Sequence, residues 1–362
     1  MKKRFEALDA FRGICALSVV VFHMHLLGSI TELDFFRGSS VFVDFFFALS
    51  GFVLAHGYGF KGNLNFKTFM KARFFRIYPL HIFMFFVFIA LEFGKLIAYK
   101  FGGFVFNYEP FTDSAAVSQI IPNLLLIQSW SPLTDHESFN FPSWSISIEF
   151  YLYVLLFFSI TLFKSNRVLS WFLISTIALL LIFLESEILV SPVLRGLSSF
   201  FGGAFTYVVY KKLSHFKPSY VTGSIIEGVL LICVVLIVQS TIEHSSIIAP
   251  VLFLFTVLFF AFESGVFSDF LKIKPLQYAG KLSYSIYMTH AAILFCLTST
   301  AMVLQKITGI EMAPMLDTTR FLNFGSSLIN NIVVIIFLSI VIYISSLTYK
   351  YIERYSQKLA YK

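Results

Sequence analysis

Ionisable residues lie inside the first hydrophobic stretch of this sequence. Residues 8–24, LDAFRGICALSVVVFHM, begin with Asp9 and Arg12 and end near His23. On an α-helix the eleven steps from Arg12 to His23 make almost a whole number of turns and rise about 16 Å, so these side chains share a stripe with Asp9. Charged side chains inside a membrane are unfavourable and usually face a polar cavity. The stripe therefore predicts that these residues line a polar cavity. The alternative is that its charges only reach out to the two membrane interfaces.

Two arginines at the start of a later hydrophobic stretch are candidates for binding phosphate. In RFFRIYPLH, residues 73–81, Arg73 and Arg76 are one helical turn apart. Guanidinium groups bind phosphate oxygens through paired hydrogen bonds, so the pair suits a nucleotide or a coenzyme A tail. The alternative is that both arginines are anchors at the cytoplasmic end of a membrane helix.

Polar residues interrupt two further hydrophobic stretches. Ser50 and Gly51 lie in the middle of FVDFFFALSGFVLAHG, residues 42–57. One interpretation is that Gly51 allows close helix packing while Ser50 bonds back to its own helix; the alternative is that the small residues leave room for a substrate arm. Glu149 lies in PSWSISIEFYLY, residues 142–153. A carboxylate at that position requires a cationic partner or a wet cavity.

A polar face occurs in LSYSIYMTHAAIL, residues 282–294. Ser283, Tyr287 and His290 follow one another at helical spacing and lie on the same side. For His290 we favour a hydrogen-bonded core residue over a catalytic one.

The composition identifies the class of protein that carries these residues. Of 362 residues, 57% are hydrophobic and 13% are charged, and the mean hydropathy is +0.81. Soluble domains carry about a quarter charged residues. A membrane-spanning helix needs about 20 apolar residues, and one stretch, SQIIPNLLLIQSW at 118–130, is too short and too polar. The other stretches are 8–30, 38–60, 74–98, 144–163, 168–184, 193–210, 222–242, 246–262, 282–304 and 326–349. We predict an all-α, polytopic membrane bundle of about ten transmembrane helices plus a short re-entrant segment at 118–130.

The basic residues predict the orientation of this bundle. Twenty of the 27 Lys and Arg residues lie before the first helix, in alternate loops or in the C-terminal tail. Because basic loops stay in the cytoplasm, both termini are predicted to be cytoplasmic. The net charge of +7 therefore reflects topology and not nucleic-acid binding. We expect a multi-pass protein of the inner (cytoplasmic) membrane, in contact with membrane lipid and folded as a single domain over residues 1–362.

The cysteines predict neither a metal site nor a disulfide framework. Cys15, Cys233 and Cys296 all lie in apolar stretches and lack ligand spacing.

The motifs above, taken in order, resemble the acyltransferase-3 family of integral-membrane O-acyltransferases. The resemblance runs nearly end to end. It rests on LDAFRG with the Arg-x10-His pairing of Arg12 and His23, on ALSGFVLA, on the Arg-x-x-Arg pair, on PSWSISIEF and on LSYSIYMTH. The family often ends its last helix with Glu-Arg/Lys-Pro, whereas this chain has Glu353, Arg354 and Tyr355 there.

The resemblance implies a donor and an acceptor. An acetyl or other short acyl group is expected to move from acyl-coenzyme A, with acetyl-coenzyme A as the expected donor, to a hydroxyl of a surface glycan or lipid-linked saccharide. The donor is expected to enter from the cytoplasm with its phosphates on Arg73 and Arg76. Ser50 and Tyr287 are assigned to the same donor site.

The resemblance also implies a mechanism for the stripe on the first helix. His23 is expected to act as general base on the acceptor hydroxyl. Glu149 is expected to orient His23 and to stabilise its charged form. Arg12 positions the donor or holds Asp9. Direct transfer is the simplest route, and an acyl-His or acyl-Ser50 intermediate is the lesser alternative.

Two other classes of protein remain as alternatives. A polar path through a helix bundle also suits a membrane transporter or carrier for a lipid-linked saccharide or small anion. No inverted repeat or pair of broken helices is recognisable, which disfavours a carrier. A purely structural membrane protein would have no need of Glu149 and His23 inside its spans.

Overall fold

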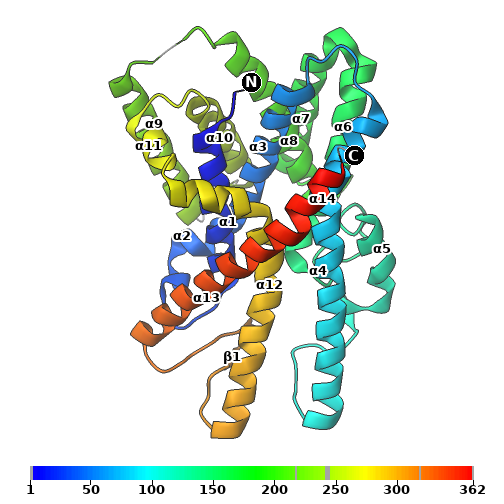
Figure 1. Ribbon diagram of the computed structural model, residues 1–362, viewed down its shortest axis with the longest axis vertical. Coiled ribbons are helices and arrows are strands. Elements are labelled where there is room, and N and C mark those ends of the chain that lie inside the picture. The colour runs from blue at the N-terminus through cyan, green and yellow to red at the C-terminus, as the bar shows by residue number, and fades with distance from the viewer. Residues whose placement is uncertain (1–2, 217, 241–244, 318, 361–362) are drawn as a thin grey trace. The chain divides into compact units, whose positions relative to one another are not determined.

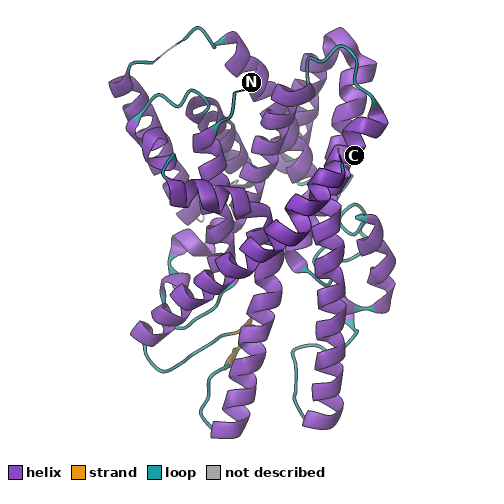
Figure 2. Cartoon of the chain, in the orientation of Figure 1, coloured by secondary structure: helices purple, strands orange, loops and turns teal. Residues whose placement is uncertain are grey.

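A computed structural model describes residues 3–216, 218–240, 245–317 and 319–360, and these residues are mostly α-helical (Figures 1 and 2). The α-helices are α1 (Glu6–His23), α2 (Asp34–Arg37), α3 (Phe42–Tyr58), α4 (Phe66–Gly102), α5 (Ile120–Leu125), α6 (Trp144–Phe163), α7 (Arg167–Phe183), α8 (Ser191–Lys212), α9 (Tyr220–Gln239), α10 (Ser245–Phe260), α11 (Val266–Leu271), α12 (Lys274–Thr308), α13 (Ser327–Thr348) and α14 (Arg354–Leu359). A small antiparallel ribbon pairs β1 (Met315–Leu316) with β2 (Thr319–Arg320). The predicted all-α membrane bundle is confirmed.

Several helices are long enough to cross a membrane. Each of the ten predicted hydrophobic stretches coincides with a helix. Among the described residues, six segments are long and apolar enough to span, namely Ser39–Tyr58, Phe66–Gly102, Phe141–Phe183, Tyr220–Gln239, Lys274–Thr308 and Ser327–Leu359. Helix α1 is not among these segments, because its 18 residues include three charged ones, Glu6, Asp9 and Arg12. Ten crossings therefore stay a prediction.

The segment that the sequence excludes from the spans is short in the structure as well. Helix α5 contains only six residues, and Leu126 ends it in the left-handed conformation with φ 57°. Six helical residues rise about 9 Å, far less than the hydrocarbon thickness of a bilayer. Helix α5 is therefore too short to cross a membrane, as predicted for residues 118–130.

The cytoplasmic placement of both termini rests on the distribution of charge. Three of the basic residues that predict it, Lys2, Lys217 and Lys362, lie outside the described part of the chain. The orientation stays a prediction.

The chain divides into two compact units, each assembled from three separate stretches. Unit 1 comprises Met1–Ala16, Gly38–Arg73 and Glu149–Ser283, and unit 2 comprises Leu17–Arg37, Phe74–Ile148 and Tyr284–Lys362. Helices α1, α4, α6 and α12 contribute residues to both units. The single domain expected over residues 1–362 stays a prediction.

Helices α3 and α8 of unit 1 pack with their backbones in close approach. A Cβ atom at Gly51 would lie 1.8 Å from the carbonyl oxygen of Phe200, and one at Gly203 would lie 1.8 Å from that of Ala48. Small residues at such contacts are typical of membrane helices, because they allow backbones to approach closely. The structure therefore shows that Gly51 allows close helix packing, which is one of the two roles suggested from the sequence.

An ion pair joins the same two helices. Arg195 donates from Nε and Nη2 to the two carboxylate oxygens of Asp44, at 3.2 and 3.0 Å. Asp44 is only 2% exposed. A bidentate guanidinium is a strong partner for a buried carboxylate, so this contact fixes the register of α3 against α8.

Hydrogen bonds hold α12 in unit 2. The Tyr284 hydroxyl donates to the carbonyl oxygen of Ile77 in α4 at 2.5 Å. Ser285 donates at 3.1 Å to Glu353, a buried residue in the π-helical segment Tyr349–Glu353 that connects α13 to α14. Bonds to two different neighbours restrict the rotation of α12 about its axis.

Candidate functional site

His23, the last residue of α1, lies beside His290 of α12 in unit 2. The Nδ1 atom of His23 is 3.1 Å from the Nε2 atom of His290, and the two rings stack at 22° with centroids 5.1 Å apart. His290 is completely buried and His23 is half-buried. The ring of Phe141 lies 4.6 Å from that of His23, so the imidazole has an aromatic neighbour as well as a polar one.

The partners of the two rings determine where their hydrogens lie. His290 Nδ1 is 3.2 Å from the carbonyl oxygen of Ile286. A carbonyl oxygen only accepts hydrogen bonds, so this nitrogen carries a hydrogen and Nε2 of the neutral ring accepts. His23 then donates from Nδ1, which leaves the lone pair of its own ring on Nε2. This is the form that a general base requires.

Arg37 anchors the end of α1 that carries His23. Its Nη2 donates to the carbonyl oxygens of Val21 and Met24, at 3.0 and 2.7 Å, and its Nη1 lies 2.8 Å from Nδ1 of His25. The last carbonyls of a helix lack their usual partner four residues on. The Val21 carbonyl also accepts from the Met24 N–H at 3.1 Å, and the arginine adds a charged donor to it and to the Met24 carbonyl. Arg37 therefore stabilises the backbone on both sides of His23.

Tyr287 has a hydrogen-bond partner within the protein. Ser145 donates to the Tyr287 hydroxyl at 3.0 Å, and Asn140 donates to the carbonyl oxygen of Met288 at 3.1 Å. Tyr287 is 5% exposed. These contacts attach the start of α6 to the turn of α12 that precedes His290. A role for Tyr287 in binding the donor stays a prediction.

Glu149 lies at the centre of a second polar cluster, in unit 1. Its Oε1 atom accepts hydrogen bonds from the hydroxyls of Ser50 at 2.6 Å and Tyr153 at 2.5 Å. Hydrogen bonds to an ionised carboxylate are short and strong. Two of the predicted site residues, Ser50 and Glu149, are therefore in direct contact. The predicted partnership of Glu149 with His23 stays a prediction.

Arg73 lies near this cluster, against two aromatic rings. Its guanidinium carbon is 5.5 Å from the ring centroid of Tyr58 and 6.0 Å from that of Tyr153, and its Nη2 lies 3.4 Å from the Tyr58 hydroxyl. Cations placed over aromatic faces are held by electrostatic attraction. Arg76 follows one turn later in α4, is half-buried and belongs to unit 2.

The remaining predicted residues lie near the start of α1. Asp9 accepts a hydrogen bond from Arg4 Nε at 2.7 Å, and both side chains are partly exposed. Asp9 thus has a cationic neighbour that the helical stripe does not predict. Arg12 is half-buried on the same helix in unit 1.

Three features of these clusters are not predicted from the sequence. His290 is a buried, hydrogen-bonded residue, as favoured from the sequence, but its contact with His23 is not predicted. Tyr153 follows Glu149 by four residues, a helical spacing that would have indicated their contact. Arg37 and Val21 are sixteen residues apart and separated by a loop, so no local pattern predicts their contact.

Comparisons with known proteins identify a family and two relatives of this chain. A family model described as an acyltransferase domain, that of the acyltransferase-3 family, matches residues 5–350. Acyltransferase MdmB of Streptomyces mycarofaciens is 35% identical over 167 residues, which are 42% of this chain and 38% of that protein. Protein 2 in picA locus of Rhizobium radiobacter is 46% identical over 86 residues, which are 22% of this chain and 41% of that protein. The chain thus spans about two fifths of the length of these two relatives. No solved structure matches it.

Proposed function

The chain belongs to the acyltransferase-3 family, and from that membership we propose that it is a membrane O-acyltransferase for a saccharide hydroxyl. The donor in this proposal is acyl-coenzyme A carrying an acetyl or other short acyl group. The acceptor is a surface glycan or lipid-linked saccharide. The protein is a multi-pass membrane protein, and we place it in the inner membrane with both termini in the cytoplasm, where the donor is available.

The observation that carries this proposal is the hydrogen bond between His290 and His23. It leaves a lone pair on His23 Nε2, and an imidazole nitrogen in that state takes a proton from an attacking hydroxyl. A partner that fixes the tautomer and orientation of a catalytic histidine is the arrangement found in hydrolase triads, where an acid fills this role. In the proposed site His290 takes this orienting role, which the sequence suggests for Glu149.

The proposed step is direct transfer. The acceptor hydroxyl oxygen attacks the thioester carbonyl carbon while its proton passes to His23 Nε2. The carbon–sulfur bond then breaks, and the departing thiolate takes the proton back from the imidazolium. The products are the acylated saccharide and free coenzyme A, and His23 returns to its starting form.

The other residues are assigned to the donor. Arg73 and Arg76 are proposed to bind its phosphates, because guanidinium groups suit phosphate oxygens. The pair of Ser50 and Glu149 is proposed to border its acyl end, and the direct hydrogen bond between them supports a joint role. Arg12 and Asp9, near the start of α1, are proposed to help position the donor.

Comparison of surface saccharides tests the function even when the acceptor is unidentified. Mass analysis of glycans from cells with the gene, without it, and with a His23→Ala copy is expected to show an acyl group only in the first. A change in the amount of exported saccharide, with its acylation unaltered, would instead support the carrier.

A further inference from the structure

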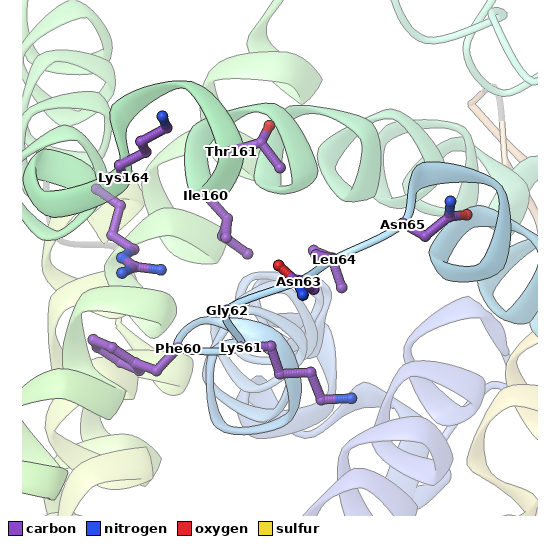
Figure 3. A pocket seen from close by; sticks show the side chains of 10 residues that line it. Phe60, Lys61, Gly62, Asn63, Leu64, Asn65, Ile160, Thr161 and Lys164 are labelled. Atoms are coloured by element: carbon purple, nitrogen blue, oxygen red, sulfur yellow. The ribbon is translucent and has the colours of Figure 1, made fainter.

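A cavity of about 590 Å³ lies in unit 1 between the loop that follows α3 and the end of α6. Residues 60–65 form one side of it, and Thr161 and Lys164 project from the other side (Figure 3). Pockets that bind small molecules have volumes of about 300–1,000 Å³. The cavity is therefore large enough for a substantial part of a cofactor-sized ligand.

The charge of the lining indicates an anionic ligand. Lys61, Lys164 and Arg167 line the cavity, and no Asp or Glu is among the described residues that do so. Asn63 and Thr161 add neutral hydrogen-bonding groups. Three cations without a carboxylate around one cavity suit a ligand that carries several phosphate charges.

Arg167 is held in place before any ligand binds. Its Nη1 donates to the carbonyl oxygen of Gly59 at 2.8 Å, and its guanidinium carbon lies 5.2 Å from the ring centroid of Phe60. The hydrogen bond to Gly59 uses one of the five N–H donors of the guanidinium group, so others can serve a ligand. A restrained arginine loses less freedom on binding than a mobile one.

A line of contacts connects this cavity with the Glu149 cluster inside the same unit. Lys61 Nζ lies 4.6 Å from the ring centroid of Tyr58. The guanidinium carbon of Arg73 lies 5.5 Å from the centroid of that ring and 6.0 Å from that of Tyr153. The Tyr153 hydroxyl donates to Glu149. Polar and aromatic groups thus follow one another from the cavity to the carboxylate.

Two helices set the separation between the cavity and the cluster. On α3, Ser50 precedes Tyr58 by eight residues, a rise of about 12 Å. On α6, Glu149 precedes the cavity residue Ile160 by eleven residues, a rise of about 16 Å. A ligand that occupies both places must be long and thin, with its phosphates at one end. Acyl-coenzyme A has this shape, because a pantetheine arm separates its phosphorylated nucleotide from the thioester.

We propose that the cavity lined by Lys61, Lys164 and Arg167 binds the 3′-phosphorylated nucleoside end of the acyl-coenzyme A donor, which leaves its diphosphate to Arg73 and Arg76 as proposed above. The proposal rests on the function proposed above, since it names the site for part of that substrate. An anionic lipid headgroup presents the same phosphate chemistry, and the test separates these two sources.

Binding of coenzyme A itself provides the test, because the free thiol cannot be transferred. The purified full chain in discs of neutral lipid would be titrated with coenzyme A, with dephospho-coenzyme A, which lacks the 3′-phosphate, and with pantetheine, which lacks the nucleotide. Lys164→Gln and Arg167→Gln are expected to raise the Kd for coenzyme A about tenfold or more, since each removes a hydrogen bond to a charged group. Both should leave pantetheine binding unchanged and reduce the preference for coenzyme A over its dephospho form.

A matched control and a lipid arm complete the experiment. Lys212→Gln removes an exposed cation in unit 1 that does not line the cavity, and this variant is expected to bind coenzyme A like the unchanged protein.

Thermal melting of each variant checks that it is folded, and Lys164 is exposed enough to be replaced without loss of packing. Wild-type affinity for coenzyme A in both folded variants overturns the assignment of the cavity. The assignment is also overturned if the variants bind coenzyme A like the unchanged protein but are no longer stabilised by anionic lipid, because the cavity would then bind a lipid headgroup. If the unchanged protein does not bind coenzyme A at all, the proposed function itself fails.

Discussion

The Nε2 atom of His290 lies 3.1 Å from the Nδ1 atom of His23, and the carbonyl oxygen of Ile286 holds the opposite nitrogen of His290. The two contacts together fix one tautomer for each neutral ring. The Nε2 atom of His23 is left unprotonated and basic. His290 is a positioning residue, because it acts on the reaction by orienting His23. The chemistry of the proposed reaction depends on this pair.

Replacing His290 tests its positioning role. His290→Phe keeps a ring but removes the acceptor, and we expect kcat to fall about tenfold or more while KM for both substrates stays near its original value. Loss of a hydrogen bond of about 1–1.5 kcal/mol in the transition state accounts for that factor. His290→Gln offers an acceptor oxygen and should restore part of kcat.

His81→Gln is the control for the His290 variants. His81 is another buried histidine of unit 2, and its Nε2 lies 2.9 Å from the carbonyl oxygen of Asn123. Its replacement should affect stability more than kcat. An unchanged kcat in well-folded His290→Phe protein would remove His290 from the mechanism.

Replacing Ser50 separates direct transfer from a covalent route. Ser50 donates a 2.6 Å hydrogen bond to Glu149, which is also the contact that a nucleophile makes with its base. Under direct transfer, Ser50→Ala loses one supporting contact and should keep activity within about tenfold of the original. Intact-mass measurement after rapid quenching should detect no acylated protein. Complete loss of activity together with an acyl-Ser50 adduct in the unchanged protein would establish the covalent route.

The approach of α3 to α8 predicts a sharp difference between two glycines of one helix. Gly51→Ala places a Cβ atom 1.8 Å from the Phe200 carbonyl oxygen, a backbone atom that no rotamer change can move. Overpacking of this kind costs about 1–3 kcal/mol or more, so the melting temperature in detergent should fall clearly. A Cβ atom at Gly57 meets nothing within 4 Å. Gly57→Ala should therefore be neutral or slightly stabilising, because alanine favours the helix by about 0.5–1 kcal/mol. Equal melting temperatures for both variants would contradict the close packing.

Cysteine labelling in intact cells tests the proposed orientation. Thr112→Cys and Thr134→Cys flank the short helix α5, so both should react with an impermeant reagent added outside. Lys61→Cys, in the loop after α3, should react only after the membrane is opened. Labelling of positions 112 and 134 from opposite sides would mean that the chain crosses between them and would reverse α6.

The sequence predicts the helices well because membrane helices are governed by local properties. Length and apolar content within one stretch are enough to find α9 or α13, and six residues of helix at α5 match the short polar stretch there. The pairing of helices depends on contacts between distant residues. No local pattern relates Asp44 to Arg195 or His23 to His290, which are 151 and 267 residues apart.

In the candidate site, too, the sequence predicts individual residues but not the contacts between them. Ser50 and Glu149 stand out because polar residues are rare inside hydrophobic stretches. Their direct hydrogen bond is visible only once α3 and α6 are folded together. The cavity beside Lys164 and Arg167 is invisible in the sequence for another reason. Basic residues at a cytoplasmic helix end are expected in every membrane protein, so their charge gives no sign of a ligand.

The central claim is most directly tested by the release of free thiol from acetyl-coenzyme A by purified protein in the presence of saccharide acceptors. The unchanged protein should release thiol in step with the appearance of acylated saccharide. His23→Ala, folded and equally abundant, should lower that rate about a hundred- to ten-thousand-fold, the usual contribution of a general base. Undiminished release by His23→Ala would contradict the role of His23. Saccharide movement across vesicle membranes without any thiol release from the unchanged protein would contradict the proposed acyl transfer.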